Sequence, residues 1–103
     1  MLLKKIIFTF FILLFSNFLL ADEKITLGLN IYNSKGECSM CHTLIAAKSS
    51  GQIGPNLDLL KPQLSQIISA VNDGIGVMPA FQGALSSDEI EAVAYFVFES
   101  TNQ

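Results

Sequence analysis

Residues 36–44 read GECSMCHTL, and this stretch decides how the rest of the chain is interpreted. It contains both cysteines of the protein, Cys38 and Cys41, and its single histidine, His42. Two thiols and an imidazole within a few consecutive positions form a concentrated set of metal-binding and covalently reactive groups. This concentration in a chain of 103 residues predicts a site for a cofactor or a metal.

The spacing Cys-x-x-Cys-His is typical of covalent attachment of a c-type haem. Thiols three residues apart on a turn can each bond to one vinyl group on the same edge of a porphyrin. His42 then directs a ring nitrogen to the iron from one face. We therefore expect one haem c per chain, bound covalently through Cys38 and Cys41, with His42 as an axial iron ligand.

Other uses of these cysteines are disfavoured. A structural zinc site takes four ligands, and the chain has no further cysteine or histidine. A thioredoxin-like dithiol occurs with a βαβ pattern, which this sequence does not show. A disulfide between Cys38 and Cys41 would close too small a loop to stabilise the fold much. The remaining alternative is a pair of incidental thiols beside a surface histidine.

The second axial ligand follows by elimination. With one histidine in the chain, two-histidine ligation is excluded, and methionine is the usual partner in electron-carrying cytochromes. Met1 lies in the N-terminal leader, and Met40 lies between the two cysteines, where it cannot reach the opposite face of the haem. Met78 is therefore the expected ligand, with Lys48 or Lys61 as remote alternatives.

The segment GPNL, residues 54–57, offers a partner for the other ring nitrogen of the histidine. The second N–H of an iron-bound histidine is usually held by a hydrogen bond, and we expect the Pro55 carbonyl to accept it. Because the chain has no arginine, we expect the haem propionates to depend on backbone N–H groups, Asn56, a lysine such as Lys61, or water. The apolar side chains expected around the porphyrin are Leu57, Leu64, Ile68 and Phe81.

The N-terminus has the layout of a secretory signal peptide. A short basic start precedes the apolar run Ile6–Leu20, which is shorter than the about 20 residues that span a membrane. We expect a signal peptide over residues 1–21, one haem domain over residues 22–103 and a periplasmic location, with an uncleaved membrane anchor as the alternative.

The predicted domain is acidic. It contains four lysines, nine aspartates and glutamates and no arginine, which gives a net charge of −5. Such a domain is a poor candidate for binding nucleic acid or an anionic membrane surface. We therefore expect no nucleic-acid partner, and no membrane contact unless the leader is kept.

The fold class is predicted to be all-α, with about four short helices around the haem. Residues 25–33 are ambiguous by period, a short helix is expected to carry residues 41–45, and residues 49–57 are expected to form a loop. A third helix is expected to start at Lys61-Pro62 and to end at residues 72–74. Its apolar face repeats at helical spacing: Leu64, Ile67, Ile68 and Val71.

The last helix has the clearest start. Ser86 and Glu89 form a capping box, with Leu85 and Ile90 as a hydrophobic staple, so the helix is expected from Ser87 to about residue 100. It is apolar over more than one face. We therefore expect it either to pack on two sides or to leave an apolar patch exposed, and residues 96–98 are candidates for a subunit interface.

In these features the chain closely resembles the class I c-type cytochromes. The resemblance covers nearly all of residues 24–102 and includes the cysteine–histidine motif, residues 54–57, the Val-Met-Pro sequence at 77–79 and a final helix with Ala-Tyr-Phe. It implies a covalent haem, histidine and methionine ligands, and first and last helices that cross at Gly28 with Tyr32 and Tyr95 nearby. The phrases GPNLDLLKP and GIGVMPAFQGALS also resemble small cytochrome subunits that accept electrons from periplasmic sulfite dehydrogenases.

The expected function is that of a periplasmic one-electron carrier rather than an enzyme. Its expected partners are redox proteins: a periplasmic dehydrogenase as donor, and a terminal oxidase or peroxidase as acceptor. One alternative is an obligate haem subunit of a dehydrogenase such as sulfite dehydrogenase. A haem enzyme or gas sensor with a labile sixth ligand is a third reading.

Overall fold

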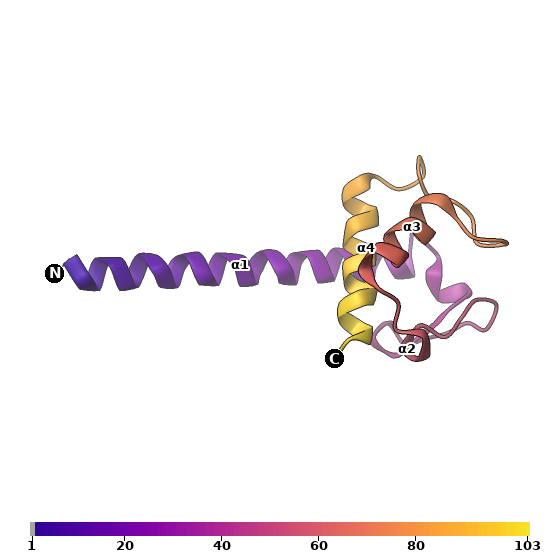
Figure 1. Ribbon diagram of the computed structural model, residues 1–103, viewed down its shortest axis with the longest axis horizontal. Helices are drawn as coiled ribbons and strands as arrows, with labels where there is room; N and C mark the ends of the chain where they lie inside the picture. Colours follow the sequence, from indigo (N-terminus) through magenta and orange to yellow (C-terminus); the bar gives the residue numbers. More distant parts are fainter. Residues whose placement is uncertain (1) are drawn as a thin grey trace.

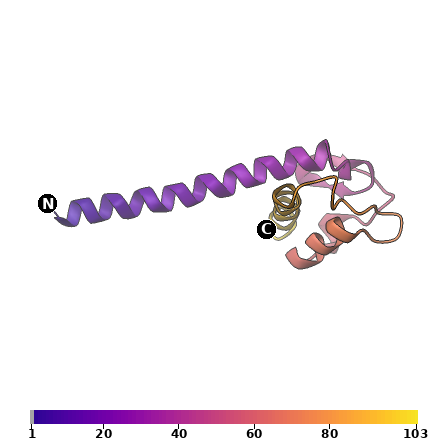
Figure 2. The ribbon, with the colours of Figure 1, turned by 90° about the horizontal axis from the view of Figure 1, so that it is seen from above.

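The computed structural model describes residues 2–103, apart from the side chains of residues 15–18. A compact body stands at one end of a long N-terminal helix (Figures 1 and 2). In chain order the elements are α1 (Leu2–Asn33), the 3-10 helix η1 (Cys38–Met40), β1 (Thr43–Leu44), the 3-10 helix η2 (Ile45–Ala47), β2 (Ser49–Ser50), α2 (Leu57–Leu60), α3 (Leu64–Asp73) and α4 (Ser87–Thr101). The predicted helical fold class is confirmed, with a small two-stranded hairpin that the sequence did not indicate.

Helix α1 is unbroken from Leu2 to Asn33. The segment left undecided at residues 25–33 is therefore helical. The described apolar side chains up to Leu20 are largely exposed, and burial begins around Gly28. Only the last turns of α1 thus belong to the core. The helix ends where the Gly36 N–H donates to the Ile31 carbonyl at 2.8 Å.

Helices α1 and α4 cross at close range, and Figure 2 shows α4 nearly end-on beside α1. A Cβ atom added to Gly28 would overlap the Ala92 carbonyl oxygen and would lie 2.5 Å from the Phe96 Cβ. Only glycine permits this approach. The Tyr32 and Phe96 rings meet edge to face beside it, with centroids 5.9 Å apart. Tyr95 lies near the crossing with its ring under the Lys24 ammonium, 5.1 Å away.

Helix α4 begins as predicted, with the Ser86–Glu89 capping box formed in both directions. It packs against α1 on one side and α3 on another, so the two-sided packing is confirmed. Phe96 and Val97 are buried within the chain and Phe98 is partly buried against the core. Most of this apolar segment therefore belongs to the core of the chain itself, and Phe98 remains partly exposed.

Helix α3 begins two or three residues later than predicted, at Leu64 rather than at Lys61-Pro62. Lys61 adopts a left-handed conformation (φ 48°) and ends α2, while Gln63 caps α3 through a reciprocal bond with Gln66. The predicted apolar face of α3 is confirmed, because Ile67 and Val71 are buried and its other two members pack partly buried against the same core.

The segment between α1 and α2 has little regular structure. The helix expected over residues 41–45 is wrong: the chain makes two 3-10 turns separated by β1, which pairs with β2 in the register Thr43–Ser50. Glu37 and Lys48 flank these turns with positive φ. A non-glycine residue seldom adopts this conformation, so no sequence signal marked the turns.

Candidate functional site

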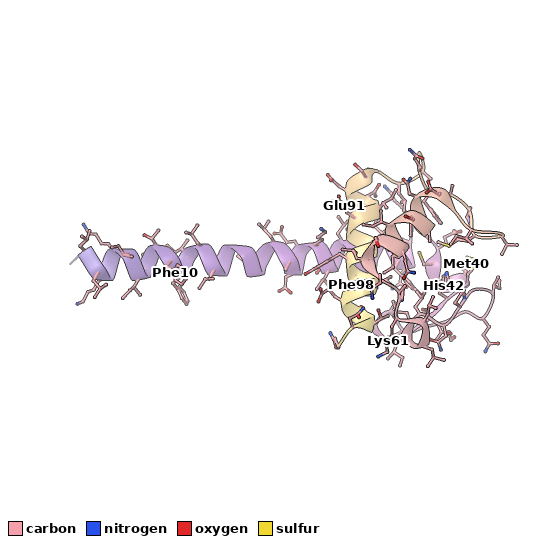
Figure 3. All side chains as sticks on the ribbon, viewed as in Figure 1. Phe10, Met40, His42, Lys61, Glu91 and Phe98 are labelled. Carbon is pink, nitrogen blue, oxygen red and sulfur yellow. The ribbon has the colours of Figure 1, made fainter. Side chains whose placement is uncertain are left out.

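The two cysteines and the histidine lie on one tight turn. The Cys38 carbonyl accepts hydrogen bonds from the N–H groups of Cys41 (3.1 Å) and His42 (2.9 Å), which brings all three side chains to one region. Both thiols are free and half-buried. Burial, with Cys41 nearby, raises the pKa of the Cys38 thiol to about 11. Figure 3 shows His42 and Met40 in the part of the body remote from the N-terminus.

The imidazole is held in one orientation by the loop that follows. His42 Nδ1 lies 2.7 Å from the Pro55 carbonyl oxygen, the group expected to accept its N–H. A carbonyl can only accept, so Nδ1 carries the proton and Nε2 keeps its lone pair. Gly54 lies flat against the ring, since a Cβ there would be 2.5 Å from His42 Cε1. The geometry leaves Nε2 as the nitrogen that can bind a metal.

A network that the sequence did not reveal fixes the backbone of the histidine. The His42 carbonyl accepts from the Ser49 hydroxyl at 3.0 Å and from the Gly51 N–H at 3.1 Å. The Ser49 oxygen lies 2.9 Å from the Tyr32 hydroxyl, which therefore donates to it. Burial is the main reason that the pKa of Tyr32 is raised. The family resemblance predicts Tyr32 only at the helix crossing, so its bond to Ser49 adds a second role.

Met78 is presented by a separate tight loop. Its N–H donates to the Ile75 carbonyl at 2.9 Å, and its carbonyl accepts from the Ile75 N–H at 3.1 Å. Gly74 and Gly76 have positive φ, and a Cβ on Gly74 would lie 2.6 Å from the Met78 carbonyl oxygen. The Met78 side chain is partly buried against the same core as Cys38.

The residues predicted to contact the haem propionates and the porphyrin lie on or beside α2 and α3, or in the loop before α4. The Asn56 side-chain oxygen caps α2 by accepting from the Leu59 N–H at 3.3 Å. Lys61 ends the same helix and is exposed. Of the four side chains expected around the porphyrin, Leu57 is buried and the other three are partly buried on the same core: Leu64, Ile68 and Phe81.

This donor set fits a covalent haem better than a bare metal ion. Among the described residues, no group of three or more histidine, cysteine, aspartate or glutamate side chains is placed to hold a metal ion. What the turn does provide is two free thiols at the attachment spacing and an imidazole with one nitrogen unengaged. A thioether follows on another loop, Met78, as a soft ligand suited to haem iron.

Comparisons with known proteins agree with this reading. Residues 23–97 match the family described as "Cytochrome C oxidase, cbb3-type, subunit III". Cytochrome c6 of Leptolyngbya boryana is 33% identical over 84 residues, which cover 74% of this chain and 92% of that protein. Cytochrome c6 of Microcystis aeruginosa is 36% identical over 76 residues, covering 68% and 89%.

Among solved structures, the c-type cytochrome SorU from Sinorhizobium meliloti has 43% sequence identity and a TM-score of 0.74. The match covers 80% of this chain and 95% of that one. The resemblance therefore extends over the whole body rather than the motif alone. From its turn, its fold and its relatives, this chain belongs to the class I c-type cytochromes, which makes it an electron carrier with one covalently bound haem c.

Proposed function

We propose that the protein is a periplasmic one-electron shuttle in which Cys38 and Cys41 form the two thioether bonds and His42 and Met78 bind the iron. The observation that carries this proposal is the 2.7 Å hydrogen bond from His42 Nδ1 to the Pro55 carbonyl. It commits one nitrogen to the protein and leaves Nε2 for the iron, on the same turn as two free thiols at the attachment spacing. The haem supplies a one-electron couple.

The work of the chain is to keep the iron surroundings the same in both oxidation states. The Pro55 carbonyl and Gly54 fix the plane of the imidazole from one side. The tight loop at residues 74–78 fixes the backbone that carries the thioether of Met78. Ligands held this rigidly change little on electron transfer. Methionine ligation also raises the reduction potential relative to a second histidine.

For the haem propionates, we propose Asn56, together with backbone N–H groups and Lys61. The Asn56 oxygen is engaged in the helix cap, so its contact with the cofactor would use the amide NH₂ group. Lys61 is exposed on the turn that follows α2. An Asn56→Asp variant, which removes the NH₂ donor but keeps a capping oxygen, is expected to lower the reduction potential with α2 intact by circular dichroism.

For location, we propose export with residues 1–21 as a cleaved signal peptide. α1 is long and apolar enough to cross a membrane, and it lies near the N-terminus. A signal sequence has the same length, apolar composition and position, so this helix fits a signal peptide. Cleavage after Ala21 would place Asp22 and Glu23 at the start of the shortened helix, where acids are favoured by the helix dipole. N-terminal sequencing of the exported protein tests this. A full-length chain in the membrane fraction would establish the anchor instead.

The central experiment is spectroscopic. The exported protein should show one covalent haem by mass spectrometry and, when oxidised, the near-infrared sulfur-to-iron band of methionine ligation. Met78→Ala should abolish the band, and the matched control Met40→Ala should keep it. A Met78→Ala protein that retains the band would refute the ligand assignment. Carbon monoxide binding by the reduced wild type would favour a haem enzyme or sensor, and co-elution with a dehydrogenase on gel filtration would favour the subunit reading.

A further inference from the structure

Tyr32 carries a polar group into an otherwise apolar core. The side chain has no exposed surface, and its ring packs edge to face on Phe96 where α1 crosses α4 (Figure 2). A phenylalanine would fill the same place without a hydroxyl to satisfy. Burying a hydroxyl is costly unless a hydrogen bond replaces the lost water. The Tyr32 hydroxyl therefore needs a partner within the chain, and that partner lies beside His42.

Two hydroxyl groups join this tyrosine to the main chain of His42, and we call them the hydroxyl bridge. The Tyr32 hydroxyl lies 2.9 Å from the Ser49 oxygen, which in turn lies 3.0 Å from the His42 carbonyl oxygen. Because a carbonyl can only accept, Ser49 donates to it and Tyr32 donates to Ser49. The direct distance from the Tyr32 oxygen to the same carbonyl is 3.5 Å, too long for a strong bond. Tyr32 thus acts on His42 mainly through Ser49.

The same carbonyl is also held from a second side. The Gly51 N–H donates to it at 3.1 Å, and the Gly51 carbonyl accepts from the Thr43 hydroxyl at 3.0 Å. Ser49 is placed for its bond by the register of the hairpin, in which it pairs with Leu44. The main chain of His42 is therefore fixed by contacts that do not involve the imidazole.

Different parts of the chain hold the two ends of His42. The ring is held by the loop that follows, through the 2.7 Å bond to the Pro55 carbonyl. The main chain is held by the hydroxyl bridge, which begins on α1 at the helix crossing. A backbone released at its own end would let the ring tilt about its bond to Pro55. The position of Nε2 thus depends on both ends.

We propose that Tyr32 and Ser49 are positioning residues for electron transfer: they hold the iron-binding nitrogen of His42 in one place and couple it to the crossing of α1 and α4. The proposal rests on the function proposed above, in which His42 binds the iron. Partners outside the set of ligands orient those ligands and tune the metal. Hydrogen bonds in series strengthen one another in surroundings of low dielectric constant, so the two hydroxyls hold the backbone better together than singly.

Variants of the holo-protein test the bridge through the iron rather than through stability alone. Ser49→Ala removes the hydroxyl next to the carbonyl, and Tyr32→Phe removes the far hydroxyl but keeps the ring on Phe96. If about a third of the net stabilisation of one hydrogen bond differs between the oxidation states, the ratio of reduced to oxidised protein at a fixed potential changes about twofold. We expect this change in Ser49→Ala and a smaller one in Tyr32→Phe.

NMR of the oxidised variants supplies a direct readout of the ligand. The haem methyl resonances depend on the direction of the imidazole plane, and they should shift in both variants. Because Tyr32 acts through Ser49, the double variant should match Ser49→Ala. Ser49→Thr keeps the hydroxyl and should restore the wild-type resonances. Resonances and ratios equal to those of the wild type in Ser49→Ala would overturn the proposal, and so would additive effects in the double variant.

Thr101→Val is the matched control for the loss of a buried hydroxyl. The Thr101 hydroxyl is buried on α4, donates to the Val97 carbonyl at 2.9 Å and lies outside the bridge. Its loss should lower the denaturant midpoint while the methyl resonances and the redox ratio stay as in the wild type. Changes in them as large as those of Ser49→Ala would mean general loosening of the core and would overturn the proposal.

The wild type separates failure of this proposal from failure of the proposed function. A wild type without a covalent haem, or without the near-infrared band of methionine ligation, refutes the function itself. A wild type that has both, with variants whose methyl resonances do not move, refutes the role of Tyr32 and Ser49 alone.

Discussion

Replacing Gly28 by alanine should destabilise the protein although alanine is the better helix former. Propensity alone favours alanine in a helix by about 1 kcal/mol. The new Cβ, however, would overlap the Ala92 carbonyl and lie 2.5 Å from the Phe96 Cβ, where non-bonded carbons rest about 3.5–4.0 Å apart. Helix α1 must therefore move away from α4 by about 1 Å or more.

The cost has two parts. Overpacking a tight contact costs about 1–3 kcal/mol, and we take the upper end because backbone rather than a flexible side chain is in the way. Separating the Tyr32 and Phe96 rings loses about 1 kcal/mol more. After the gain in propensity, we expect a net loss of about 3 kcal/mol, a large part of the about 5–15 kcal/mol that stabilises a typical domain.

Guanidinium unfolding of the holo-protein, followed by far-ultraviolet circular dichroism, measures this loss. With a slope of about 3 kcal/mol per M, the midpoint should fall by about 1 M. Gly76→Ala is the control: its Cβ meets nothing within 4 Å, and only its φ of +56° opposes the change, at about 1–2 kcal/mol. A Gly28→Ala midpoint at or above that of the wild type would refute the close crossing of α1 and α4.

Three further outcomes are expected. Gly54→Ala pushes a methyl group against the His42 ring, so the reduction potential and the near-infrared band should shift while the haem stays covalently bound; unchanged values would mean that the ring is not held there. Ser86→Ala removes one half of the α4 capping box and should lower the free energy of unfolding by about 1 kcal/mol in urea titrations, whereas no loss would contradict the cap. The pKa of Glu89 lies below its ordinary value of 4.5, because Lys35 and the Ser86 N–H donate hydrogen bonds to its carboxylate. The ionised carboxylate therefore adds to the free energy of unfolding above pH 4.5. This stabilisation is lost as the pH falls through the lower pKa of the folded state. In Glu89→Gln, the free energy of unfolding should therefore fall less steeply with decreasing pH below 4.5. An unchanged pH dependence would contradict the Lys35–Glu89 ion pair.

Local patterns in the sequence predicted the well-formed helices. The capping box at Ser86 and the apolar repeat from Leu64 to Val71 are signals carried by neighbouring residues, and both helices form where those signals are. The family, the haem and the carrier function followed from the cysteine–histidine motif. The roles of individual ligands, and the cleavage after Ala21, stay predictions.

The turns around the site were not predictable in the same way. Glu37, Lys48 and Lys61 each adopt positive φ, which is usually the place of glycine or asparagine, so nothing in their chemistry marks the end of a turn. Each of the three closes a tight turn, because its N–H donates to the carbonyl three or four residues earlier: Glu37 to Ser34, Lys48 to Ile45 and Lys61 to Leu57. The η2 turn is joined to α2 by the bond from the Ile45 N–H to Asp58. A helix over residues 41–45 was therefore a reasonable local expectation that the assembled fold overrides.

The contact between α1 and α4 joins segments from opposite ends of the domain, and every residue assigned to the haem lies in the stretch between them. The contact between the two helices therefore closes the stretch between them into a single loop. Loop closure has an entropic cost that the α1–α4 contact offsets for the whole stretch. A chain that lacks α4 would keep every residue assigned to the haem but would lose this closure.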